Sequence, residues 1–161
     1  MKILSFLILL SLPISILSQK APLKWKEIPM EDLQMTTYEL EPSAPAIVLC
    51  DYGQIYFNTN ANGRTLFVIN ERHLRIKILN TEGLKYAKFS LSFINMSCEQ
   101  LPSENPVIIK GMVYNLSDKG ELIASKLKNK EIEYRDTANC MRIAEIKFPD
   151  VKPGSIIDFY Y

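Results

Sequence analysis

Short apolar runs separated by turn residues fill the chain from Ala46 to Tyr161. Apolar, β-branched and aromatic residues dominate these runs, and that composition is typical of strands. We expect strands within residues 46–58, 66–79, 87–93, 107–116, 122–127, 132–134, 143–148 and 155–161. The pattern predicts an all-β fold, an antiparallel β-sandwich-like domain.

Two of these segments alternate between apolar and polar residues. The first has one apolar face and one polar face, formed by Leu74, Ile76 and Ile78 and by His73, Arg75 and Lys77. The second carries Phe89 and Leu91 on its apolar face. Such alternation predicts half-exposed strands, with the polar face in solvent. Residues 80–83, with Gly83 free to take a positive φ, predict a turn that joins the two segments in a hairpin.

The last two runs, 143–148 and 155–161, are expected to pair with each other across the turn sequence PDVKPG. From Ile156 to Tyr161 only Asp158 interrupts two largely apolar or aromatic faces. A strand of this kind suits a position that is covered on both sides, and not a free edge. We therefore expect the polypeptide to continue beyond Tyr161.

The chain opens with MKILSFLILLSLPISILSQK, which has the layout of a secretory signal peptide. Lys2 precedes an apolar run that Pro13 interrupts, and the small residue Ser18 precedes Gln19. A transmembrane anchor is the alternative, but the run is shorter than the roughly 20 residues that a bilayer requires. We expect a signal peptide over 1–18, an N-terminal segment over 19–45 and an incomplete β-sandwich domain over 46–161.

The N-terminal segment predicts one short helix near residues 30–37. Pro29 precedes two acidic residues in the first turn, Glu31 and Asp32, and this arrangement favours a helix start. Pro42 and Pro45 prevent the helix from extending further.

The charge balance argues against a nucleic-acid partner. Removal of Lys2 with the signal peptide leaves 18 basic side chains and 18 acidic ones. A neutral chain of this kind does not favour nucleic acid or an anionic membrane.

Three cysteines, Cys50, Cys98 and Cys140, are an odd number for an exported protein. Cys50 lies in an apolar strand and is interpreted as a small buried hydrophobe. The sequence leaves open whether Cys98 and Cys140 form a disulfide. No Cys-x-x-Cys or Cys/His cluster is present, so we expect no metal site.

The inventory of catalytic side chains is small. His73 is the single histidine, and a solvated strand face explains it better than a general base or a metal ligand. A Cys50–His73 pair is disfavoured because Cys50 lies in an apolar strand. Four aromatic residues suggest either a carbohydrate-binding rim or ordinary packing, and packing is favoured: Trp25, Tyr52, Tyr56 and Phe57. We expect no catalytic, cofactor-binding or metal-binding residues.

Four segments occur in an order that carries a family resemblance: PMEDLQMTTYELEPSAPAIVLCDYG, RHLRIKILNTEGLKYAKFSL, GMVYNLSDKGELI and IKFPDVKPGSIIDFYY. Over residues 30–161 the chain resembles the domain of unknown function that lies N-terminal to transglutaminase-like domains in exported bacterial envelope proteins. Phe159 stands where the terminal motif of that family has Tyr.

The resemblance implies that the last strand continues into more sheet and then into a transglutaminase-like domain. That domain would carry the Cys, His and Asp of a papain-like site, and none of these maps onto this chain. The implied function is a noncatalytic module that positions or shields the following domain, in the periplasm or at the cell surface of a Gram-negative bacterium. A module that binds envelope glycan or peptide is the alternative. A complete enzyme is a third reading, which the lack of a Cys–His–Asp set opposes.

Overall fold

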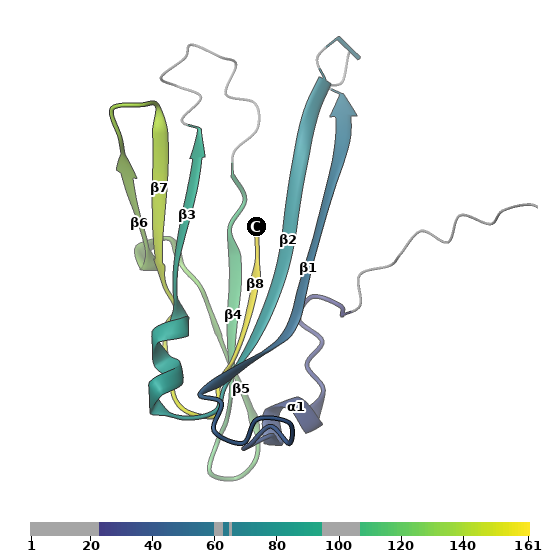
Figure 1. Ribbon diagram of the computed structural model, residues 1–161, viewed down its shortest axis with the longest axis vertical. Helices are drawn as coiled ribbons and strands as arrows, with labels where there is room; N and C mark the ends of the chain where they lie inside the picture. The colour runs from purple at the N-terminus through teal and green to yellow at the C-terminus, as the bar shows by residue number, and fades with distance from the viewer. Residues whose placement is uncertain (1–22, 60–62, 65, 95–106) are drawn as a thin grey trace, which may run out of the picture.

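The computed structural model describes residues 23–59, 63–64, 66–94 and 107–161. Their secondary structure is dominated by strands, which run along the long axis of the molecule (Figure 1). The elements are α1 (Met30–Gln34), β1 (Ala46–Thr59), β2 (Leu66–Ile78), the 3₁₀ helix η2 (Thr81–Ala87), β3 (Lys88–Ile94), β4 (Lys110–Leu116), β5 (Leu122–Lys126), the 3₁₀ helix η3 (Asn129–Glu131), β6 (Ile132–Asp136), β7 (Met141–Lys147) and β8 (Ile156–Tyr160).

The strands form two antiparallel sheets. The larger sheet has the order β1-β2-β8-β4-β5, and the smaller has the order β3-β7-β6. This arrangement confirms the all-β, sandwich-like fold, with one short α-helix in the part of the chain that the structure describes. β4 and β5, which lie within the expected strand segments 107–116 and 122–127, pair as an antiparallel hairpin.

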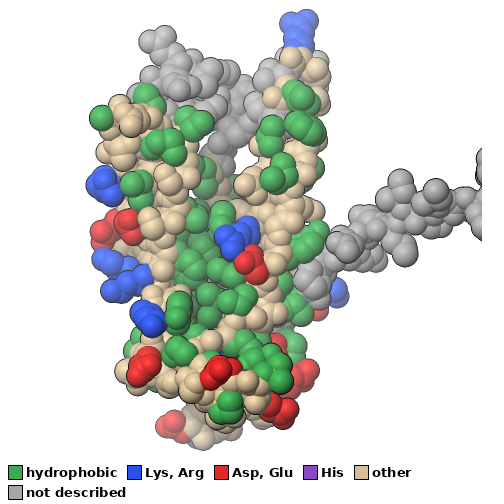
Figure 2. Space-filling model, viewed as in Figure 1, with side chains coloured by type: hydrophobic (Ala, Val, Ile, Leu, Met, Phe, Trp, Pro, Cys, Tyr) green, Lys and Arg blue, Asp and Glu red, His purple; other side chains and the backbone are tan. Residues whose placement is uncertain are grey.

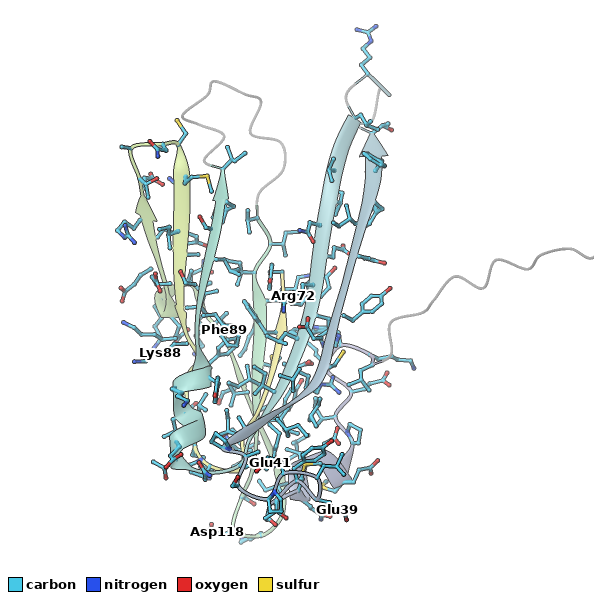
Figure 3. The ribbon with its side chains drawn as sticks, in the orientation of Figure 1. Glu39, Glu41, Arg72, Lys88, Phe89 and Asp118 are labelled. Atoms are coloured by element: carbon cyan, nitrogen blue, oxygen red, sulfur yellow. The ribbon has the colours of Figure 1, made fainter. Side chains whose placement is uncertain are left out.

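Apolar side chains from both sheets form the main core. Leu74, Ile76 and Ile78 of β2 face it, as the alternation predicted. Phe89 of β3 points toward the larger sheet, where its ring centroid lies 4.9 Å from that of Phe159 (Figure 3). Phe148 completes this aromatic cluster, 5.3 Å from Phe159.

The final strand, β8, lies inside the larger sheet between β2 and β4. Its residues Ile156, Ile157, Asp158 and Phe159 have no exposed surface. The expectation of a strand covered on both faces is therefore confirmed. The expected pairing with residues 143–148 is wrong, because those residues lie in the smaller sheet. A strand with two apolar faces buries both only in a sheet that has cover on each side.

The expected hairpin between residues 66–79 and 87–93 is also wrong. The two strands belong to different sheets, and η2 connects them in place of a tight turn. Asn80 caps η2, since its side-chain oxygen accepts a hydrogen bond from the backbone N–H of Glu82. Gly83 is buried and does not have a positive φ. A Cβ there would lie 2.1 Å from the carbonyl oxygen of Pro45, so this position requires glycine for close approach.

The N-terminal helix is where the sequence placed it, but it is shorter. It ends at Gln34, before Met35, whose φ of −59° and ψ of 124° leave the helical region. Leu33 is its buried residue, and it packs against the outer face of the larger sheet.

We predict that Ile76→Ala lowers the free energy of unfolding by about 2–5 kcal/mol, because it leaves a cavity in the main core. Ile76 is 7% exposed. The matched control is Ile123→Ala on β5, where Ile123 is 48% exposed and the expected cost is within about 0.5 kcal/mol. Urea melts measure both costs, and equal values would contradict this placement of the core.

Candidate functional site

The polar face of β2 is buried, which corrects the expectation of a solvated face. His73 is 4% exposed, and Arg75 and Lys77 have no exposed surface. Residues 23–35 lie across this face and hydrogen-bond to it at several points. Alternation reveals which residues share a face, but a polar face under a covering segment has the same pattern as one in water.

Asp158 is the centre of a buried charge network. It lies directly opposite Arg75 in the β2–β8 register. Arg75 Nε donates to Asp158 Oδ1 at 3.1 Å, and Arg75 Nη2 lies 3.3 Å from Oδ2. His73 Nε2 lies 2.6 Å from Asp158 Oδ1. An aspartate without exposed surface needs such partners, since burial of an unpaired carboxylate is very costly.

The same network holds the N-terminal segment in place. The backbone N–H of Lys26 donates to Asp158 Oδ2 at 2.9 Å, and Arg75 Nη2 donates to the carbonyl oxygen of Lys24 at 2.9 Å. Lys26 has a φ of 68°, which is uncommon for a residue other than glycine. Among the described residues Arg75 Nη1 has no hydrogen-bond partner. The charge pair therefore acts as an anchor for residues 24–26.

Lys77 makes a second attachment further along the same face. Its Nζ donates to the carbonyl oxygens of Leu33 at 2.6 Å and Gly154 at 2.7 Å. Burial lowers the pKa of Lys77 to about 8, although Asp32 acts in the opposite direction. Beside it, Leu33, Tyr114 and Ile156 form a second apolar cluster beneath α1.

A pocket of about 460 Å³ opens beside the charge network. The N-terminal segment and three strands contribute its walls, with Trp25, Tyr52, Gln54, Glu71, His73 and Tyr160 among the lining residues. The ring centroid of Trp25 lies 5.7 Å from that of His73 and 6.1 Å from that of Tyr160. The volume is within the usual range for small-ligand sites.

Glu71 is the carboxylate of this pocket. Gln54 Nε2 donates to Glu71 Oε2 at 2.6 Å, and Tyr56 Oη donates to Oε1 at 3.0 Å. The hydrogen bond from Gln54, together with those from Tyr160 and Tyr56, lowers the pKa of Glu71. Burial and the hydrogen bond to Glu71 raise the pKa of Tyr160 to about 12. At neutral pH the pocket therefore contains an ionised carboxylate and a neutral phenol.

The structure places the aromatic residues that the sequence singled out in two different settings. Trp25 and Tyr52 line the pocket. Phe57 lies opposite Val68 in the β1–β2 register, but it is 69% exposed and so does not belong to the core. Tyr56 is 39% exposed and bonds to Glu71. Phe57 therefore has the expected cross-strand partner, but its side chain is not buried in the core.

Cys50 is buried, as the sequence suggested, and is a free thiol. Burial raises its pKa, and its Sγ lies 3.9 Å from the carbonyl oxygen of His73. The imidazole Nε2 of His73 is bonded to Asp158, whereas the hydrogen bond of Cys50 goes to the backbone of His73. Cys140 is disulfide-bonded, and Cys98 lies outside the described residues. Within those residues no three His, Cys, Asp or Glu side chains form a group suited to a metal ion.

Sequence reasoning did not single out Glu71, Gln54 or Tyr160, nor the ion pair between Arg75 and Asp158. One signal was present. Asp158 is the only charged residue in a strand with two otherwise apolar faces, and a buried carboxylate requires a cation nearby. The strand that supplies this cation is a neighbour of β8 in the sheet. The sequence pattern does not predict the order of strands in a sheet, so it did not identify Arg75.

No protein-family model, curated protein or solved structure matches the chain. Among the described residues no helix is long and apolar enough to cross a membrane. The expected signal peptide, residues 1–18, lies outside the described residues.

We predict that Arg75→Ala lowers the free energy of unfolding by about 3–5 kcal/mol, because it leaves Asp158 charged and buried without its main partner. Arg72→Ala is the matched control on the same strand. The Arg72 side chain is 44% exposed and pairs with Asp51, so its removal is expected to cost about 1 kcal/mol or less. Chemical denaturation compares the two variants, and a small cost at both sites would show that the network does not stabilise the fold.

We predict that the stability contributed by Lys77 rises with pH. The native state releases the Lys77 proton near pH 8, whereas the unfolded chain keeps it until about pH 10.5. Between these values the unfolded state binds more protons, so a rise in pH favours the native state. From about pH 7 to pH 9.5 the free energy of unfolding should rise by about 1–2 kcal/mol more in the unmodified protein than in Lys77→Met. The tyrosines and Cys50 titrate in both proteins, so their contribution is removed when the two pH profiles are subtracted. Parallel profiles of the two proteins would contradict the prediction for Lys77.

Proposed function

We propose that this chain is a noncatalytic β-sandwich module of an exported protein, which positions or shields a transglutaminase-like domain that follows it in the same polypeptide. The observation that carries the proposal is an apolar surface with an open strand edge beside the end of β8. The family resemblance of residues 30–161 supplies the identity of the partner.

The open edge belongs to β2. This strand pairs with β1 over its whole length, but with β8 only from His73 to Lys77. Arg72 extends the pairing by one step, since its N–H donates to the carbonyl oxygen of Tyr161 at 2.7 Å and Tyr161 N–H donates back at 3.0 Å. Among the described residues no strand pairs with this edge of β2 over 66–71 (Figure 1). Such an edge is a template for one more strand.

Exposed apolar side chains lie next to this edge. In the β1–β2 register they are on the same sheet face as Leu74 of the core, and each is more than 60% exposed: Ile55, Phe57, Leu66 and Val68. Figure 2 shows apolar side chains gathered on the upper part of the β1–β2 pair. An exposed apolar row of this kind is typical of a surface that another protein element covers.

The register specifies how a further strand fits. A segment in line with β8 and antiparallel to β2 would place its backbone opposite Asn70 and then Val68. Alternate side chains of that segment would cover the apolar row. This agrees with the resemblance, in which the equivalent of 155–161 continues into more sheet. Export to the periplasm or cell surface belongs to the same proposal and is supported by the composition of residues 1–18.

A module that binds peptide or glycan is the second candidate. The pocket around Trp25 and Tyr52 favours it, because aromatic rings and a fixed carboxylate meet there.

We predict that extension of the polypeptide through the following domain raises the melting temperature and gives a monomer. Residues 19–161 alone should associate, because their apolar row is uncovered. Analytical ultracentrifugation and thermal melts compare the two forms. In the longer form the backbone N–H groups of Val68 and Asn70 should gain protection from hydrogen exchange.

A matched variant, Phe57→Ser, should reduce association of residues 19–161, whereas Tyr134→Ser on β6 should not. Tyr134 is exposed to a similar extent, 54%, but lies in the smaller sheet. A stop codon directly after Tyr161, or a monomeric 19–161 with a sharp two-state melt, would overturn the proposal.

A further inference from the structure

We propose that the pocket around Glu71 binds an organic cation, the ammonium or guanidinium end of a lysine or arginine side chain in a peptide. This is a ligand site on the outer face of the larger sheet, separate from the apolar row on its inner face. It does not depend on whether another domain follows.

The first argument is the charge of Glu71. Its carboxylate is held by three neutral groups, the amide of Gln54 and the hydroxyls of Tyr56 and Tyr160. Among the described residues it forms no ion pair within 4.0 Å. The carboxylate is therefore fixed in direction while its charge is without a contacting cation.

Three basic side chains of the described residues lie in or near the pocket, and Lys24 lines it, but none of them forms an ion pair with Glu71. Lys24 Nζ lies 3.4 Å from Glu27 Oε1. Arg75 is paired with Asp158, which neutralises the buried charge beneath the pocket. Lys110 lowers the pKa of Glu71 from a distance, and its Nζ lies 5.7 Å from the centroid of the Tyr160 ring. Since none of these contacts the carboxylate, an added cation gains a direct partner.

The second argument is the aromatic lining. Trp25, Tyr52 and Tyr160 surround the pocket on the side of the N-terminal segment, β1 and β8. Aromatic faces attract cations through their quadrupole, and several rings around one carboxylate form the arrangement that recognises ammonium groups. The aliphatic stem of lysine or arginine would pack on the same rings. An anionic ligand would instead be repelled by Glu71.

Trp25 is the single tryptophan of the chain and lines the pocket, so the tryptophan fluorescence of the protein is sensitive to ligand binding there. We would titrate the protein with Nα-acetyl-lysine amide and Nα-acetyl-arginine amide and follow the fluorescence of Trp25. Nα-acetyl-norleucine amide is the control ligand, since it has a similar aliphatic side chain without the ammonium group. Methyl glucoside tests a neutral saccharide. The cationic ligands should change the fluorescence saturably, with an affinity that falls as salt is added.

Glu71→Gln should weaken binding of the cationic ligands by about tenfold or more, because it removes the charge and retains the shape. Glu133→Gln is the matched control; the Glu133 side chain is 71% exposed on β6 and should not affect binding. Equal binding of norleucine, preference for the glucoside, or no saturable change with any ligand would overturn the proposal. If Glu71→Gln does not fold, two measurements on the unmodified protein test the proposal. They are the affinity for the cationic ligands relative to Nα-acetyl-norleucine amide, and the fall of that affinity with added salt.

Discussion

The buried ion pair between Arg75 and Asp158 is the constraint on which the rest of the structure depends. Neither side chain has exposed surface, so each requires the other and the remaining hydrogen bonds of the network. Those bonds come from His73 and from the backbone of Lys26, which lie on different segments. The pair therefore fixes the register of two strands and the path of the N-terminal segment together.

Two layers of packing follow from this arrangement. On the inner face of the larger sheet, Ile76, Ile157 and Phe159 pack against the smaller sheet. On the outer face, α1 and its Leu33 cover the second apolar cluster, and Lys77 ties the carbonyl of Leu33 to β2. The pocket exists because the N-terminal segment lies over β2 and β8 and brings Trp25 close to His73 and Tyr160.

The sequence predicted the strands and their inner faces because both depend on local patterns. Leu74 and Phe89 face the core as alternation requires. It did not predict that β2 and β3 belong to different sheets, or that a segment more than 40 residues upstream covers Arg75. These facts depend on contacts that are distant in sequence. At the site, the sequence identified Trp25 and Tyr52 as candidate binding residues. It did not identify Glu71, because a glutamate on a strand has the same local pattern whether or not it lines a pocket.

The most direct test of this account is hydrogen exchange at the backbone N–H of Lys26, which donates to Asp158 Oδ2 in the structure. If the charge network anchors the N-terminal segment, this group should be protected nearly as strongly as the N–H of Ile157 in β8, since both would open only with the fold. Exchange of Lys26 at the rate of an unstructured peptide, while Ile157 stays protected, would contradict the account.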